Sequence, residues 1–229
     1  MNQKYSNLTE YPLKSTFGFI DASSGKIETI INLVKENNKN KDDIIAIICH
    51  PHPLHGGTMH NKVVHTASKA FNELGIDAIR FNYRGVGKSE GKFGNSIGEA
   101  EDLQSIINWV QAHKPNAQLI LAGFSFGSFI ALTGACNPKN NCISLISIAP
   151  AVNHQDYDNY MPMDKNLPWL LIHGTEDEVI DFDIVKNWLD NLLVKPQFEF
   201  FDGASHFFHG RLLELKSSII NFTLKHTPK

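Results

Sequence analysis

The chain is poor in cysteine, with three among 229 residues, and this scarcity argues against a fold that depends on disulfides. Cys49, Cys136 and Cys142 are also an odd number, so we expect reduced thiols that pack in the core. A chain of this length can bury a sizeable core without disulfides or metals. We therefore expect one globular domain over residues 1–229.

Long apolar runs and blocks of one charge are missing as well. No run of about 18 apolar residues exists, and the polar start Met1-Asn2-Gln3-Lys4 lacks the charged-then-apolar pattern of a secretory signal. The net charge is -3, without the basic block that a nucleic acid or an anionic membrane would require. We therefore expect a soluble cytoplasmic protein that acts on a small molecule, with neither nucleic acid nor membrane as partner; a homo-oligomer stays open.

What the sequence does contain is an alternation of short apolar runs with helical patterns. This alternation predicts an α/β fold with a doubly wound, mostly parallel sheet and helices on both faces. Two extended segments near 15–20 and 26–34, around a turn at 21–25, predict antiparallel strands at the N-terminal end. The stretch between Ala149 and Trp169 is too short for a multi-helix cap, so we expect no cap domain and an open crevice. Strands are predicted near 44–49, 78–83, 118–122, 143–149, 169–174 and 197–201, and helices near 61–74, 96–114, 128–132, 183–193 and 210–225.

The pentapeptide Gly123-Phe124-Ser125-Phe126-Gly127 is a G-x-S-x-G motif placed where a predicted strand gives way to a helix. Glycines on both sides of the serine permit a tight, strained turn that lifts one hydroxyl clear of the sheet. We therefore predict that Ser125 is a nucleophile on a nucleophile elbow.

A serine hydroxyl is a poor nucleophile at neutral pH, so an elbow implies a histidine base and an acid that orients it, in the chain order serine, acid, histidine. After the predicted strand 169–174 we choose Asp177 as the acid; Glu176, Glu178 and Asp181 compete, and some of these carboxylates are expected only to start the next helix. After the predicted strand 197–201 we choose His206 as the base. Catalytic groups gather at the carboxyl ends of strands in open α/β sheets, so these loops can meet in one crevice.

Residues 50–60, HPHPLHGGTMH, follow a predicted buried strand and allow two interpretations. In the first, the loop supplies one backbone N–H of an oxyanion hole and Phe126 supplies the other. Proline has no N–H, which leaves His52 or Leu54, and we favour His52 because it follows closely on the histidine that ends the strand. In the second, His50, His52 and His55 bind a metal, but the aspartate expected before the third histidine is Leu54. We predict no metal.

Residues 82–89 end in Gly-Lys-Ser after a strand and nearly match a phosphate-binding loop. That motif needs glycine where this chain has Asn82, so we predict a glycine-rich turn. Arg84 in this turn either makes structural hydrogen bonds or attracts an anionic group of the substrate. The other candidate substrate-binding residues are aromatic and methionine side chains near the crevice: Tyr157, Tyr160, Met161 and Phe207.

With these motifs together, the chain resembles the α/β-hydrolase superfamily, and within it the small lidless, dienelactone-hydrolase-like group. The segments that carry the resemblance are 50–59, 80–87, 123–127 and 205–210. The resemblance implies Ser125, Asp177 and His206 as the catalytic triad. True dienelactone hydrolases carry cysteine at the elbow, whereas this chain has Ser125, which argues against dienelactone as the substrate.

These residues predict a serine hydrolase that needs no cofactor and acts on small or short-acyl carboxylic esters. Ser125 would attack the carbonyl carbon, His206 would carry the proton, and an acyl-enzyme intermediate would follow. A peptidase or an acyltransferase with the same triad is an alternative, and so is a binding protein that keeps the fold without turnover.

Overall fold

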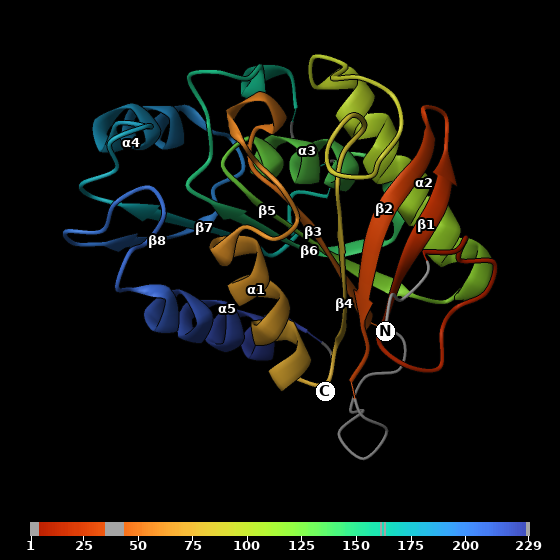
Figure 1. Ribbon diagram of the computed structural model, residues 1–229. Helices are drawn as coiled ribbons and strands as arrows, with labels where there is room; N and C mark the ends of the chain where they lie inside the picture. The colour runs from red at the N-terminus through yellow and green to blue at the C-terminus, as the bar shows by residue number, and fades with distance from the viewer. Residues whose placement is uncertain (1–4, 35–43, 161, 163, 228–229) are drawn as a thin grey trace.

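A computed structural model describes residues 5–34, 44–160, 162 and 164–227, and eight strands form one sheet in the order β1-β2-β4-β3-β5-β6-β7-β8 (Figure 1). The strands are β1 Thr16–Ala22, β2 Gly25–Asn32, β3 Ile44–Cys49, β4 Asp77–Phe81, β5 Gln118–Phe124, β6 Cys142–Ile148, β7 Trp169–Gly174 and β8 Gln197–Phe201. β1 pairs antiparallel with β2, and β2 pairs antiparallel with β4. The pairs from β4 through β8 are parallel. The mostly parallel sheet with antiparallel N-terminal strands is therefore confirmed.

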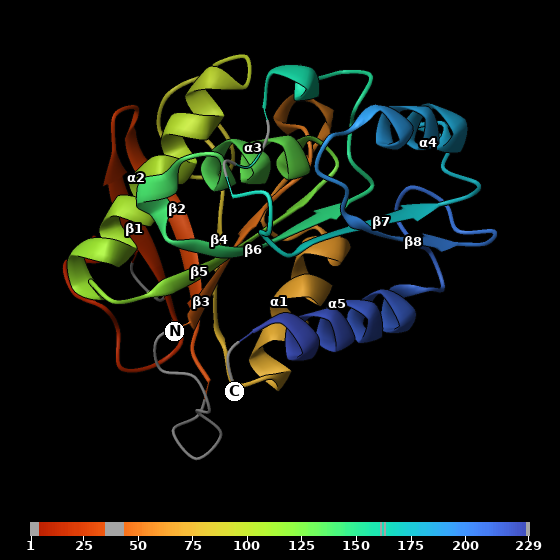
Figure 2. The same cartoon turned by 180° about the vertical axis from the view of Figure 1, so that it is seen from behind.

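Five α-helices in the described part of the chain cover the two faces of the sheet (Figures 1 and 2). They are α1 Lys62–Glu73, α2 Ile97–His113, α3 Phe126–Ala135, α4 Phe182–Asn191 and α5 Leu212–His226. The buried apolar residues of α1 and α5 share one core cluster with one set of strand side chains, and those of α2, α3 and α4 share a second cluster with the opposite set. This division follows from the alternation of side chains along each strand, which makes the parallel strands apolar on both faces.

Local sequence signals place the helix starts that flank the site. Ser96 and Glu99 form a capping box at the start of α2, as their spacing predicted. Asp181 caps α4 by accepting hydrogen bonds from the amides of Asp183 and Ile184. The carboxylate of Asp181 is therefore used in starting a helix, which was one of the two roles considered for the acidic residues of this loop.

The loops at the carboxyl ends of the parallel strands meet along one edge of the sheet. The loop between β6 and β7 covers residues 149–168, and its described residues contain one turn of 3-10 helix, η4 Tyr157–Asn159, in place of a cap. Met161, a candidate substrate-binding residue, lies outside the described residues. None of the helices within the described ranges is long and apolar enough to cross a bilayer.

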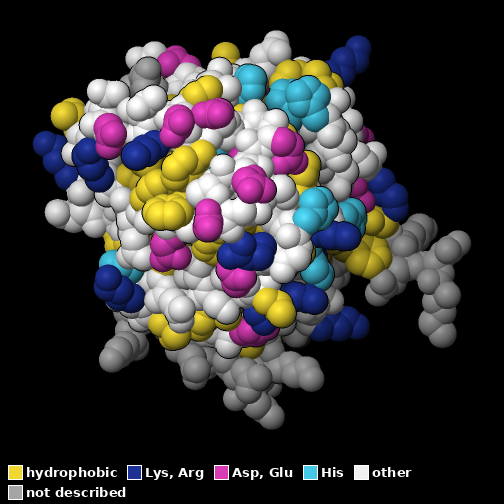
Figure 3. Space-filling view, turned by 90° about the vertical axis from the view of Figure 1, so that its left-hand side faces the viewer, with side chains coloured by type: hydrophobic (Ala, Val, Ile, Leu, Met, Phe, Trp, Pro, Cys, Tyr) yellow, Lys and Arg dark blue, Asp and Glu magenta, His cyan; other side chains and the backbone are white. Residues whose placement is uncertain are grey.

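The far edge of the sheet is formed by β8, with α4 above it. Phe200 of β8 is more than half exposed and lines an apolar hollow of about 400 Å³ together with Phe182 and Phe198. Figure 3 looks onto this side of the molecule and shows hydrophobic side chains bordered by charges of both signs. This hollow is separate from a larger one, which is lined by the start of α2 with the residues before it and by the loop at 154–160.

Candidate active site

Ser125 occupies the turn between the end of β5 and the start of α3. Its backbone has φ 55° and ψ -119°, outside the regions that residues with a Cβ atom prefer. A Cβ at Gly123 would overlap the carbonyl oxygen of Gly127, and one at Gly127 would overlap the carbonyl oxygen of Cys49. The two glycines are therefore required by close packing of the turn against itself and against β3, which is the physical reason for the motif's spacing.

Hydrogen bonds to the end of β6 and within α3 hold the turn in place. The amide of Ser125 donates to the carbonyl oxygen of Ile148 at 2.8 Å, which ties the turn to β6. Ser128 Oγ donates to the carbonyl oxygen of Ser125 at 2.6 Å and lies 2.7 Å from Tyr157 Oη. Tyr157 is 1 % exposed, so it buttresses the turn from the core. Its predicted place in the lining of the substrate crevice is corrected accordingly.

His206 and Asp177 form a short hydrogen bond, with 2.7 Å between Nδ1 and Oδ2. Asp177 Oδ1 also accepts the amides of Val179 at 2.9 Å and Ile180 at 2.7 Å. Burial alone would raise the pKa of Asp177, but the hydrogen bonds from His206 and the two amides outweigh it and hold this pKa below its ordinary value. Asp177 is therefore ionised at neutral pH and accepts the Nδ1 proton of His206.

The sheet brings the His206–Asp177 pair and Ser125 to the same edge. The three residues follow β8, β7 and β5, whose carboxyl ends point the same way. The ring of His206 lies 4.9 Å, centroid to centroid, from the ring of Phe124, the residue directly before Ser125. Phe207 packs edge-on against both rings and is 39 % exposed, which places it at the rim of this region. Within the described residues, no hydrogen bond joins Ser125 Oγ to His206; such bonds often tighten only when substrate binds.

Two further residues support the pair. The Glu178 carboxylate accepts the backbone amide of His206 at 3.0 Å, which ties the loop after β8 to the loop after β7. The sequence offered Glu178 as a competitor for the acid or as a residue that starts the next helix, and not as a partner of the His206 amide. Buried His173 lies behind Asp177: its Nε2 is 2.9 Å from the carbonyl oxygen of Ile180 and 3.6 Å from Asp177 Oδ2. Its position on β7 beneath the acid loop was readable from the sequence, but its contact with that loop was not.

The loop after β3 uses His50 in the framework of the fold. Its Nδ1 lies 2.7 Å from the carbonyl oxygen of Pro51, and its Nε2 accepts the amide of Tyr83 at 3.2 Å. Burial lowers the pKa of His50 to about 3, so the ring is neutral, with Nδ1 as the donor. Both ring nitrogens are therefore engaged within the protein.

The two candidate oxyanion donors in this loop differ in what their amides do. The amide of Leu54 donates to His52 Nδ1 at 3.2 Å and is therefore occupied. Within the described part of the chain, the amide of His52 has no hydrogen-bond partner. The amide of Phe126, at the first position of α3, has no partner within its own helix. The His52 ring lies 4.9 Å from the Phe126 ring, so the two amides belong to neighbouring residues in space.

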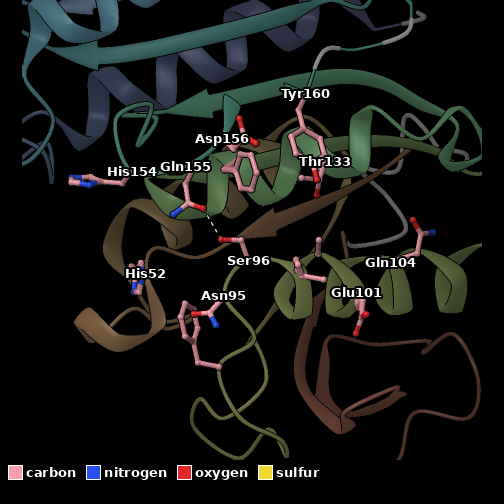
Figure 4. A pocket seen from close by; sticks show the side chains of 14 residues that line it. His52, Asn95, Ser96, Glu101, Gln104, Thr133, His154, Gln155, Asp156 and Tyr160 are labelled. Carbon is pink, nitrogen blue, oxygen red and sulfur yellow. Dashed lines mark hydrogen bonds between the residues drawn. The ribbon is translucent and has the colours of Figure 1, made fainter. Parts of the chain in front are cut away.

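A hollow of about 800 Å³ opens beside His52 and is the larger of the two described above (Figure 4). Its walls come from the loop after β3, the 93–104 segment, α3 and the loop at 154–160. Ser96 Oγ donates to Gln155 Oε1 at 2.6 Å and joins two of these walls, as the dashed line in Figure 4 shows. Of the candidate substrate-binding residues, Tyr160 is in this lining. No local sequence pattern announces the hollow, because its walls are far apart in the chain.

Arg84 lies in a network of ion pairs with α2. Its Nη2 is 2.8 Å from Asp102 Oδ1 and 3.0 Å from Glu101 Oε2, and its backbone amide donates to Asp102 Oδ2 at 2.8 Å. The Arg84 side chain is 13 % exposed and that of Asp102 is fully buried. Of the two roles expected for Arg84, the structure therefore supports structural hydrogen bonds, and its use for an anionic substrate is corrected.

Comparisons with known proteins agree with this architecture. Residues 52–167 match the model of a family described as serine aminopeptidase, S33. A lidless α/β serine hydrolase from Xanthomonas campestris is 35% identical, with a TM-score of 0.90 over 97% of this chain and 99% of that one. An α/β serine hydrolase homologue from Coxiella burnetii is 41% identical, with a TM-score of 0.85 over 93% of this chain and 99% of that one.

A shorter match is to acyl-protein thioesterase 1 from Yarrowia lipolytica. It is 28% identical over 106 residues, which are 45% of this chain and 46% of that protein. The family model spans half of the chain, and the two solved hydrolases extend over nearly all of it. The chain therefore belongs to the serine aminopeptidase S33 family of α/β serine hydrolases, in a form without a lid.

Proposed function

We propose that this hydrolase cleaves small or short-acyl carboxylic esters through an acyl-enzyme, with Ser125 as nucleophile, His206 as base and Asp177 as the acid that orients it. The observation that carries the proposal is the strained turn at Ser125 beside a histidine already bonded to an ionised carboxylate. A residue is held in such a conformation only where the surrounding structure over-determines it. No cofactor is required for this chemistry.

The mechanism follows from the tautomer of His206. Because Nδ1 donates to ionised Asp177, the neutral ring carries its lone pair on Nε2. Nε2 would take the Ser125 proton as Oγ attacks the ester carbonyl, and would then return it to the leaving alcohol. Water would attack the acyl-enzyme by the same route and release the acid.

The negative charge on the carbonyl oxygen needs donors that are in place before the reaction. The amides of Phe126 and His52 are our choice, because the amide of Leu54 already has a partner. Removing one such donor typically costs about 2.7–4 kcal/mol of transition-state stabilisation, but a side-chain substitution does not remove an amide. A crystal structure with a phosphonate on Ser125 would test the choice, since its oxygen should lie about 3 Å from both nitrogens.

The nucleophile is tested by pre-steady-state kinetics with nitrophenyl acetate and butyrate. We expect the wild type to release a burst of nitrophenol and Ser125→Ala to release none. Ser217→Ala, on the exposed side of α5, is the matched control and should keep the burst. An activated phosphonate should label Ser125 in the wild type, located by mass spectrometry. Equal activity in the wild type and Ser125→Ala would overturn the mechanism.

A second candidate is cleavage of an amide or thioester by the same residues. The description of the matching family favours an aminopeptidase, and the similarity to acyl-protein thioesterase 1 favours a thioester. Esters, thioesters and aminoacyl amides with one common acyl group would separate these activities by kcat/KM. A thioester or amide preferred over its matched ester by tenfold or more would replace our first choice.

A further inference from the structure

The hollow beside His52 lies on one side of the proposed reacting groups. His52 lines it, and the ring of Phe93 in its wall lies 6.2 Å from the ring of Phe126, the residue after the nucleophile. Phe129, one turn further along α3, also lines it. The hollow therefore begins beside the elbow and extends along α3 towards Thr133.

Its position relative to His206 indicates which half of an ester it would hold. On the proposed mechanism His206 protonates the leaving alcohol, so the alcohol must lie on the side of His206. Among the described residues that line the hollow, none comes from the 173–210 segment that carries Asp177 and His206. The hollow therefore suits the acyl half of the substrate.

The lining mixes polar and apolar side chains, and besides its carboxylates it includes the histidines His52 and His154. It includes Glu101 and Asp156, and its described residues include no lysine or arginine. Glu101 is paired with Arg84, whereas Asp156 forms no ion pair within the described chain and accepts only the side-chain amide of Asn159, at 2.7 Å. Asp156 therefore supplies the uncompensated charge of the hollow. Aromatic walls, Phe93 and Phe129 among them, complete the surface.

We propose that this hollow binds the acyl group of the substrate and selects acyl groups with an aromatic ring and a hydroxyl or ammonium substituent against those with a carboxylate. The inference rests on the proposed function, because it concerns the same reaction. Aromatic walls suit a ring, and a carboxylate such as that of Asp156 attracts an O–H or N–H donor and repels an anion.

The first experiment tests the place of the acyl group with Ala100→Trp, which fills the hollow from α2. Ala112→Trp, on an exposed site of the same helix, is the matched control. The substrates are nitrophenyl phenylpropanoate, with a large acyl group, and naphthyl acetate, with a large alcohol. We expect Ala100→Trp to lower kcat/KM for the phenylpropanoate, relative to kcat/KM for naphthyl acetate, by about tenfold or more through a higher KM for the phenylpropanoate. Ala112→Trp should leave this ratio unchanged. A fall confined to naphthyl acetate would overturn the assignment of the acyl half.

The second experiment tests charge with nitrophenyl phenylpropanoate and its para-hydroxy, para-aminomethyl and para-carboxy derivatives. We expect the wild type to have a kcat/KM for the hydroxyl compound about tenfold higher than for the carboxylate at low salt. This ratio should fall as ionic strength rises. Asp156→Asn should narrow this ratio about fivefold, whereas Asp190→Asn, an exposed site on α4, should leave it unchanged.

The outcomes separate this inference from the proposed function. No activity on any ester, together with no labelling of Ser125, would refute the function itself. An active enzyme that hydrolyses the carboxylate as fast as the hydroxyl compound would refute the charge selection alone. An equal effect of Asp156→Asn and Asp190→Asn would assign the selection to net charge and overturn the role of the hollow. The wild-type ratio and its salt dependence test the charge selection even if a variant fails to fold.

Discussion

The backbone strain at Ser125 predicts an unusual result when this residue is replaced by glycine. Ser125→Ala and Ser125→Gly both remove the hydroxyl and should both abolish ester cleavage. They differ in the Cβ atom, which the alanine variant must keep at φ 55° and ψ -119°. Glycine adopts such angles without a clash. The difference in stability between the two variants therefore measures the strain stored in the turn.

The magnitude follows from three contributions. Changing a buried alanine to glycine loses one methyl group, worth about 0.8 kcal/mol, and adds about 0.5–1 kcal/mol of backbone entropy cost. Relief of a strained backbone at this turn returns about 1–3 kcal/mol. Since Ser125 is 8 % exposed, the methyl loss applies almost in full. We expect Ser125→Gly to lie between about 0.8 kcal/mol less and about 1.7 kcal/mol more stable than Ser125→Ala.

The control is Ala131→Gly in α3, a fully buried site with ordinary helical geometry. There no strain is relieved, so the same exchange should cost about 1.5–2 kcal/mol. The assay is urea unfolding of the wild type and the three variants, and the four curves are analysed with a common m-value. If the change from alanine to glycine lowers the free energy of unfolding by as much at position 125 as at position 131, the turn stores no strain and the reasoning is wrong.

Three further predictions concern the groups around the turn. Asp177→Asn should lower kcat/KM by about 10⁴, because the amide no longer holds His206 in the productive tautomer. Since the pKa of Asp177 is lowered on folding, the wild type's stability advantage over this variant should be complete above about pH 4 and shrink below it, as urea midpoints at several pH values would show. Glu178→Ala frees the amide of His206 and should reduce kcat about tenfold while phosphonate labelling persists; an unchanged kcat would remove Glu178 from the positioning of His206. Arg84→Ala leaves the buried Asp102 unpaired and should cost about 3–5 kcal/mol of stability with little effect on KM, and a large rise in KM with intact stability would restore a substrate role.

The parts of the site that the sequence predicted are those carried by local patterns. The strain at Ser125 could be anticipated because the two glycines that permit it stand two residues away on either side. The capping box at Ser96 is likewise local and lies where its spacing indicated, and Asp181 caps α4 as one of the carboxylates of its loop was expected to do. The proposed pairing of Asp177 with His206 needed one more step, the rule that carboxyl ends of parallel strands share an edge. The structure places the two 2.7 Å apart, while their catalytic roles stay a prediction.

Residues whose role depends on distant partners could not be assigned in this way. Tyr157 reads as a crevice residue in a polar loop, but its hydroxyl reaches Ser128 and its ring is buried against α3. Arg84 sits in a glycine-rich turn open to several functions, and the buried Asp102 on α2 decides among them. The sequence by itself determined the sheet, the turn and the residues offered to the chemistry, because apolar periodicity and glycine act over a few residues. Only the tertiary structure decided which polar side chains pair within the framework and which line the hollow, because each buried polar group must find a partner wherever the fold brings one near.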